Sequence, residues 1–181
     1  MVVALVGFGA FGALVLPAQA ERAEAYTAGA GSPDTTLLYS ADDLVAAAAA
    51  YGADGRSDFV TARLTFDVVW PLVYDVTLCI LLTVVLRRAT GDASRWRLVN
   101  LLPWAALIAD YLENTATSIV MLTYPDALRA AAVIAPVLTF TKWMLVLASF
   151  VVLLVATVPA IVALVRGAPR TPQVHPTDPS L

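Results

Sequence analysis

Ionisable side chains lie inside the long apolar stretches of this sequence, where a charge needs a nearby partner. The third stretch carries a polar stripe with the i, i+3, i+4 and i+7 spacing of one helical face: Asp110, Glu113, Asn114 and Thr117. Tyr111 flanks the stripe. A charge at the centre of a bilayer costs at least about 2.5–3.5 kcal/mol, so we expect these groups to face protein partners or a watery cavity.

Complementary groups occur in the second and fourth stretches. Arg63 and Asp67 are spaced i, i+4, so they can form an ion pair, and Tyr74 lies further along the same helical face. Asp75 points about a quarter-turn away and has no partner within its own helix. Lys142, in the fourth stretch, is the only lysine of the protein.

The expected depths of these residues in a membrane predict that they meet. The second and fourth helices run inward and the third runs outward, so Asp67, Glu113 and Lys142 come to similar heights. We therefore predict a buried polar cluster with these members: Arg63, Asp67, Asp110, Glu113, Asn114 and Lys142, with Tyr74 and Tyr111 as hydrogen-bonding neighbours.

Such a cluster is compatible with three classes of function. Polar residues often join transmembrane helices, so the leading hypothesis is a structural or accessory membrane protein. Because burial disfavours a charged carboxylate, Asp110 or Glu113 can instead carry a proton or bind a cation in a proton- or cation-linked transporter or small-molecule binding protein. Paired carboxylates beside a lysine and tyrosines can also perform acid–base chemistry on a lipid. The signal for a lipid-modifying enzyme is weak, and we favour a non-enzymatic role.

The composition indicates that lipid is the main solvent of the chain. Apolar residues make up 60% and charged residues 14%, against about 45–50% and about 25% in soluble domains. With one cysteine, Cys79, and one histidine, His175, the sequence argues against disulfides, zinc sites and Ser/His/Asp machinery. The net charge of −3 gives no basic patch for nucleic acid.

These features leave few partners to expect. We predict no cofactor, no metal and no nucleic acid partner. The expected partners are the lipid bilayer and either another membrane protein or further copies of this chain in a homo-oligomer.

Four apolar blocks predict an all-α, polytopic membrane protein, a four-transmembrane-helix bundle formed by one domain over residues 1–168. The expected spans are about 2–20, 62–86, 98–123 and 133–165, followed by a flexible cytoplasmic tail at 169–181. The sequence Ala18-Gln19-Ala20 matches a signal-peptidase site, but no positive charge precedes the first block, which favours a retained helix over cleavage after Ala20.

The outer segment 21–57 is expected to contain a short interfacial helix. Ser40 and Asp43 form a capping pattern directly before the helix-forming run 44–51, and Gly52 follows as a stop signal. A second helix is expected to begin near Arg56 and to enter the membrane without a break.

The positive-inside rule predicts the orientation. Basic residues gather around the loop after the second span and at the start of the tail: Arg87, Arg88, Arg95, Arg97, Arg166 and Arg170. Both termini are therefore expected in the cytoplasm, with segment 21–57 outside. The predicted location is the inner (plasma) membrane.

Several motifs resemble those of an uncharacterised family of small bacterial four-helix integral membrane proteins. They are Leu16-Pro17-Ala18-Gln19-Ala20, Gly31-Ser32-Pro33-Asp34-Thr35, Tyr51-Gly52-Ala53-Asp54-Gly55-Arg56, Leu64-Thr65-Phe66-Asp67-Val68-Val69-Trp70-Pro71-Leu72-Val73-Tyr74, Asn100-Leu101-Leu102-Pro103, Asp110-Tyr111-Leu112-Glu113-Asn114 and Thr141-Lys142-Trp143. The resemblance covers most of the chain and implies a retained first helix. It implies no activity, substrate or mechanism, and Asp75 and Cys79 lie outside the family pattern.

Overall fold

The protein is all-helical over the part of the chain that the computed structural model describes, residues 2–90 and 95–165. Its elements are α1 (Val2–Thr27), the 3-10 helix η1 (Pro33–Thr35), α2 (Ala41–Leu64), α3 (Phe66–Thr90), the 3-10 helix η2 (Arg95–Asn100), α4 (Leu101–Thr123) and α5 (Arg129–Val165). The predicted all-α class is confirmed. The predicted tail 169–181, including His175, lies outside the described residues.

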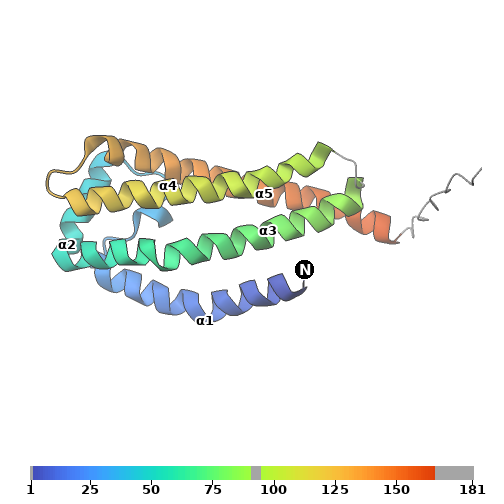
Figure 1. The fold of residues 1–181 in the computed structure, drawn as a ribbon, viewed down its shortest axis with the longest axis horizontal. Helices are drawn as coiled ribbons and strands as arrows, with labels where there is room; N and C mark the ends of the chain where they lie inside the picture. The colour runs from blue at the N-terminus through green and yellow to red at the C-terminus, as the bar shows by residue number, and fades with distance from the viewer. Residues whose placement is uncertain (1, 91–94, 166–181) are drawn as a thin grey trace, which may run out of the picture.

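The four long helices α1, α3, α4 and α5 run side by side along the long axis, and α2 lies at one end of the bundle (Figure 1). Helix α5 packs against both α3 and α4, while α1 packs against α2 and α3. Two helical stretches are long and apolar enough to cross a membrane: Ala41–Thr90, which comprises α2 and α3, and Arg129–Val165.

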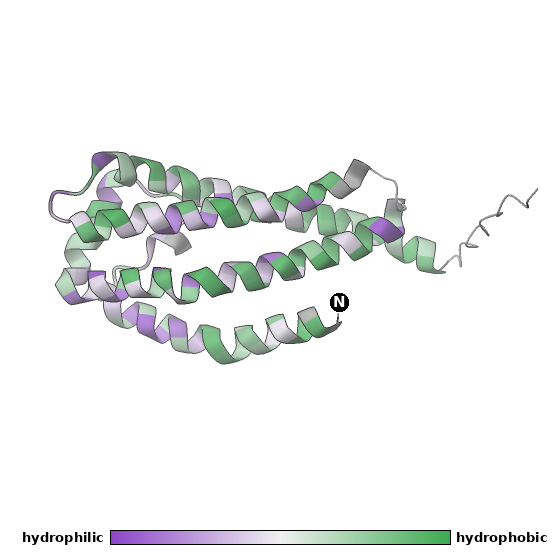
Figure 2. Cartoon of the chain, viewed as in Figure 1, coloured by the Kyte–Doolittle hydropathy of each residue, from purple (hydrophilic) through white to green (hydrophobic). Residues whose placement is uncertain are grey.

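Large apolar side chains face outward along the bundle, and many polar side chains face inward. Ile108 of α4 and Leu154 of α5 are exposed, whereas Glu113, Thr117 and Thr139 have no exposed surface. Apolar positions predominate along the helices, and hydrophilic positions interrupt α3 and α4 in mid-length (Figure 2). This is the reverse of a soluble protein, in which exposed positions are mostly polar.

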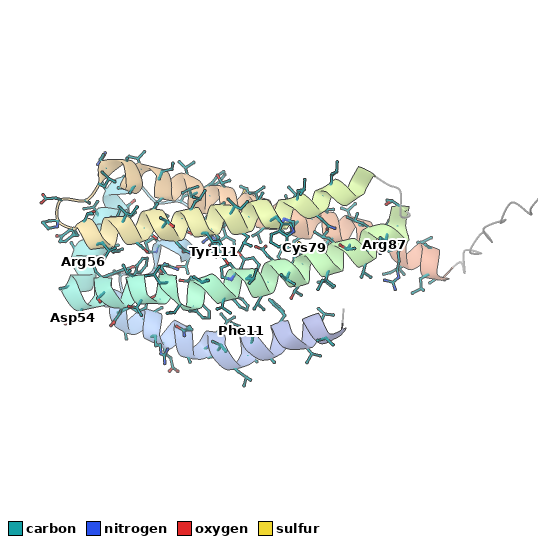
Figure 3. All side chains as sticks on the ribbon, in the orientation of Figure 1. Phe11, Asp54, Arg56, Cys79, Arg87 and Tyr111 are labelled. Carbon is teal, nitrogen blue, oxygen red and sulfur yellow. The ribbon has the colours of Figure 1, made fainter. Side chains whose placement is uncertain are left out.

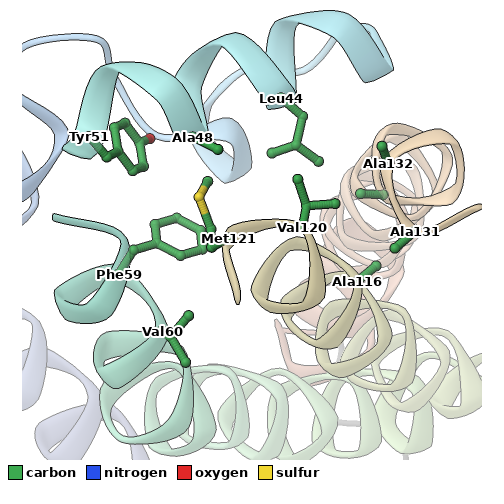
Figure 4. Close-up of a cluster of buried hydrophobic side chains, with 11 residues drawn as sticks. Leu44, Ala48, Tyr51, Phe59, Val60, Ala116, Val120, Met121, Ala131 and Ala132 are labelled. Carbon is green, nitrogen blue, oxygen red and sulfur yellow. The ribbon is translucent and has the colours of Figure 1, made fainter. Parts of the chain in front are cut away.

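An apolar core fills the end of the bundle at α2. Phe59 and Val60 of α2 pack against Val120 and Met121 of α4 (Figure 4). The contact between α4 and α5 in this core uses small side chains, which let the helix backbones approach closely: Ala116, Ala131, Ala132 and Ala135. This core fixes the relative positions of α4 and α5, on which the candidate site depends.

The start of α2 follows the predicted capping pattern. The backbone N–H of Ser40 donates to Asp43 Oδ2 at 2.8 Å, and the N–H of Asp43 donates to Ser40 Oγ at 3.2 Å. Gly52 breaks the helix with a positive φ of 68°, a conformation that glycine adopts without steric cost.

The predicted unbroken entry of this helix into the membrane is wrong. Thr65, with φ −119° and ψ −78°, is the single residue between the end of α2 at Leu64 and the start of α3 at Phe66. The Thr65 hydroxyl donates to the carbonyl of Thr61 at 2.6 Å, and such back-bonding often bends helices.

Helices α1 and α5 extend beyond the spans that the apolar blocks predict. Helix α1 continues past residue 20 to Thr27 because the residues after Pro17 are mostly good helix formers such as alanine and glutamate. Helix α5 starts at Arg129 instead of residue 133, because an alanine-rich turn precedes the apolar block.

Candidate binding site

Lys142 of α5 forms ion pairs with two carboxylates of α4. Its Nζ lies 2.7 Å from Asp110 Oδ1 and also contacts Glu113 Oε2. The i, i+3 spacing of Asp110 and Glu113 presents both carboxylates on the face of α4 that packs against α5. All three side chains are buried, so the removal of one partner would leave an uncompensated charge.

Arg63 forms a separate ion pair, at the end of α2. One guanidinium nitrogen lies 2.5 Å from Asp67 Oδ2, and the other donates to Ser32 Oγ at 3.0 Å. The guanidinium also lies over the ring of Phe59, 4.3 Å from its centroid. Arg63 therefore joins the segment after α1 to the start of α3.

The segment between α1 and α2 packs over this end of the bundle. Tyr39 and Thr139 share a hydrogen bond of 3.0 Å between their hydroxyls, and Tyr51 donates to the carbonyl of Gly31 at 2.5 Å. Sequence reasoning missed the roles of Ser32 and Tyr39, because residues in a loop follow no period that could show which way they face.

The other predicted cluster residues lie around these two ion pairs. The Tyr111 hydroxyl donates to the carbonyl of Val68 at 2.8 Å and so joins α4 to α3. Tyr74 packs edge-on against Trp70, with ring centroids 5.9 Å apart. Asn114 is buried next to Glu113. The structure thus brings Asp110, Glu113 and Lys142 into direct contact and pairs Arg63 with Asp67.

Asp75 is the most deeply buried charged residue of α3, at 1% exposure. Neither of its carboxylate oxygens has a hydrogen-bond partner among the described residues. The negative charge of Asp110, on α4, would repel a negative charge at Asp75. Its spacing from Asp67 gave no reason to include it in the cluster, and only the packing of α4 against α3 reveals its position.

A cavity of about 490 Å³ adjoins both ion pairs. Its polar wall contains five of the predicted cluster residues: Arg63, Asp67, Tyr74, Asp110 and Lys142. Its remaining walls are mostly apolar, with five aromatic side chains among them: Phe8, Phe66, Trp70, Trp143 and Phe150. The cavity therefore fits a molecule with a polar group and an apolar body.

Helix α1 forms one side of this cavity and α5 the opposite side. Phe8 and Phe11 of α1 stack on Trp70 of α3, with ring centroids 5.6 and 5.4 Å apart. Phe11, labelled in Figure 3, lies on the α3-facing side of α1. The sequence analysis did not assign α1 to the site, although the sequence contains the aromatic residues Phe8 and Phe11 of α1 and Trp70 of α3.

The site contains more carboxylates than cations. Arg63 and Lys142 pair with three carboxylates, those of Asp67, Asp110 and Glu113, which is a formal excess of one negative charge. No group of three or more His, Cys, Asp or Glu side chains suited to a metal ion occurs within residues 2–90 and 95–165. The excess of negative charge suits the binding of a proton or a cation.

No family model, no curated protein and no solved structure matches this chain. The geometry of the cavity and its ion pairs accordingly carries the functional argument.

Proposed function

We propose that this chain is a multi-pass membrane protein that binds a small organic cation with an apolar body. The observation that carries the proposal is the cavity between α1 and α5, with ionic groups on one wall and aromatic side chains on the others. A volume of about 490 Å³ lies within the ~300–1,000 Å³ typical of small-molecule sites.

The outward-facing apolar surface supports the membrane part of the proposal. We infer four crossings, by α1, α3, α4 and α5, because all four expose large apolar side chains such as Leu14, Leu72, Ile108 and Leu154. Arg87 and Arg88 at the end of α3 support a cytoplasmic location for that end, with the outer segment and α2 on the opposite side. The resemblance noted above supports a bacterial plasma membrane.

The ion pairs also support the structural role that leads among the sequence-based hypotheses. Lys142 links α5 to α4 through Asp110 and Glu113. A role in stability alone gives no reason for a cavity beside the pairs, however. We therefore place ligand binding first and regard stabilisation of the bundle as the second consequence of the same residues.

The excess of carboxylates and the aromatic walls favour a cationic ligand. A positive group near Asp67 and Asp110 would offset part of the negative charge. Aromatic rings in the cavity wall can attract a cation through their quadrupoles, by about 0.5–2 kcal/mol each. An anionic ligand would add to the excess negative charge.

A pair of matched probes tests this proposal. Tetraphenylphosphonium and tetraphenylborate have nearly the same size and apolar surface but opposite charge. The full chain is reconstituted in nanodiscs with Trp96 and Trp104 replaced by Phe, so that the quenching of Trp70 and Trp143 fluorescence reports on the cavity. We expect saturable quenching by the cation and only non-saturable partitioning of the anion.

Carboxylate variants localise the binding. We expect Asp67→Asn and Asp110→Asn each to weaken cation binding by about tenfold or more, since interactions with charged groups contribute about 1.5–3 kcal/mol. Asp126→Asn, in the exposed turn between α4 and α5, is the matched control and should bind normally. The proposal would be refuted if the two probes quenched the fluorescence equally, or if the cation bound Asp67→Asn and Asp110→Asn as tightly as the unaltered chain.

A lipid-modifying enzyme would use the same cavity, because Asp67 and Asp110 both line it. Vesicles of bacterial phospholipid incubated with the reconstituted chain, followed by mass spectrometry of the lipids, separate the two functions. New lipid products that disappear with Asp110→Asn would favour the enzyme.

A further inference from the structure

The buried carboxylate of Asp75 has no role in the site described so far. It lies on the α4-facing side of α3 and does not line the cavity. Three ion pairs engage Asp67, Asp110 and Glu113, whereas Asp75 has neither a cation nor a hydrogen-bond donor among the described residues.

An isolated ionised carboxylate is too costly at such a position. Transfer of an unpaired charge into an apolar interior costs so much that the group normally becomes neutral. The neighbouring titratable groups do not offset the charge: Tyr74 and Cys79 on α3 and Tyr111 on α4 contribute none when protonated. Asp110 is itself an anion, and the only lysine, Lys142, is engaged with Asp110 and Glu113. A bound proton is the simplest way to neutralise Asp75.

Asp110 connects Asp75 to the cavity. It lines the cavity, forms an ion pair with Lys142 and interacts electrostatically with Asp75. A cation that enters beside Asp110 lowers the electrostatic cost of a second negative charge at Asp75. Ligand entry therefore favours the loss of the Asp75 proton.

Polar groups lead from Asp75 toward the basic end of α3. Cys79 and Thr83 follow at i+4 and i+8, on the same face of the helix. Asn100 contacts both of them: its carbonyl accepts from Cys79 Sγ at 3.9 Å, and its Nδ2 donates to Thr83 Oγ1 at 2.7 Å. Cys79 lies on α3 between the level of Tyr111 and that of Arg87 (Figure 3). The side-chain oxygen of Asn100 is buried and has no partner in the described part of the chain, so it can accept one further donor such as water.

We propose that Asp75 is a proton-binding site that empties when a cation occupies the cavity, so that the protein exchanges a proton for an organic cation. This inference rests on the proposed function. In the exchange the O–H bond of the Asp75 carboxyl group breaks, the electron pair stays on the carboxylate, and the proton passes to water. The cation enters from the α1–α5 side.

Infrared spectroscopy of the full chain in nanodiscs tests the proton site without any ligand. We expect a carbonyl stretching band of a protonated carboxyl group at neutral pH that disappears in Asp75→Asn and persists in the matched control Asp126→Asn. Asparagine has the shape of the neutral acid, so the variant should keep its fold, which circular dichroism verifies. A band that persists in folded Asp75→Asn, or no band at all in the unaltered protein, would overturn the proposal.

Proton release on addition of tetraphenylphosphonium tests the coupling. In weakly buffered solution we expect about one proton released per cation bound by the unaltered chain, and none by Asp75→Asn. At pH values low enough to keep Asp75 protonated, the affinity of the unaltered chain for tetraphenylphosphonium should fall about tenfold for each unit by which the pH is lowered. This pH dependence should vanish in Asp75→Asn. Equal proton release from both proteins would overturn the coupling.

The two proposals fail in different ways. If tetraphenylphosphonium does not bind the unaltered chain, the proposed function fails, while the infrared band still decides whether Asp75 holds a proton. If the cation binds without proton release, the proposed function stands and the coupling is refuted.

Discussion

Replacing Lys142 with methionine should destabilise the bundle more than replacing any exposed basic residue. Methionine keeps most of the length and volume of the side chain but removes its charge. Asp110 and Glu113 would then remain buried beside each other without a cation. Both carboxylates lie on the same face of α4, so the loss affects the whole α4–α5 interface.

The expected magnitude follows from the burial of the pair. Breaking a buried ion pair by removing one partner costs about 3–5 kcal/mol, a large fraction of the ~5–15 kcal/mol that stabilises a typical domain. Arg129→Met is the matched control, because Arg129 also forms an ion pair, at 2.9 Å from Asp42. The side chains of that pair are 73% and 83% exposed, so its loss should cost at most about 1 kcal/mol.

Reversible unfolding in mixed micelles gives the change in the free energy of unfolding for each of the two variants. The combined variant with Lys142→Met, Asp110→Asn and Glu113→Gln removes all three charges and should recover most of the lost stability, because no uncompensated charge remains. If Lys142→Met costs no more than Arg129→Met, or if the neutral combination is as unstable as the single variant, the argument from buried charge is refuted.

Two further predictions concern α2. Ser40 donates hydrogen bonds from its backbone N–H and its hydroxyl to Asp43, which hold the pKa of Asp43 below its ordinary value of 3.8. The resulting stabilisation is fully present above pH 3.8 and is lost as the pH falls through the lower folded value, so amide hydrogen exchange in the first turn of α2 should accelerate in that range, and Asp43→Asn, which has no carboxylate to titrate, should remove this dependence. A methyl group at Gly55 would collide with the backbone carbonyl of Tyr26, so Gly55→Ala should cost about 1–3 kcal/mol in the same unfolding assay. Gly9→Ala, which meets no atom within 4 Å, is its control and should leave stability unchanged or slightly raised.

Helical periodicity explains which features the sequence could predict. The i, i+3 spacing of Asp110 and Glu113 placed both carboxylates on one face, and the high cost of a charge in lipid required a partner for Lys142. The i, i+4 spacing of Arg63 and Asp67 predicted their pair in the same way. These predictions depend only on local geometry and on charge, which a single sequence contains.

The remaining features depend on contacts between distant segments. Whether Thr65 bends a helix depends on its rotamer, because the hydroxyl competes with the regular backbone bonds. Ser32 and Tyr39 lie in a loop whose path is set by the helices around it. The isolation of Asp75 could not be foreseen because it results from what α4 places opposite it, an acid at Asp110 in place of a base.

The ion pairs of Lys142 have a consequence for biogenesis in the proposed topology. Helix α4 carries Asp110 and Glu113 but no cation of its own, and each carboxylate adds about 2.5–3.5 kcal/mol to the cost of leaving the insertion machinery for lipid. Its compensating charge arrives with α5, after the short turn 124–128. The two helices should therefore enter the membrane together as a hairpin, and a ribosome-bound chain that ends before Lys142 should remain held at the translocon.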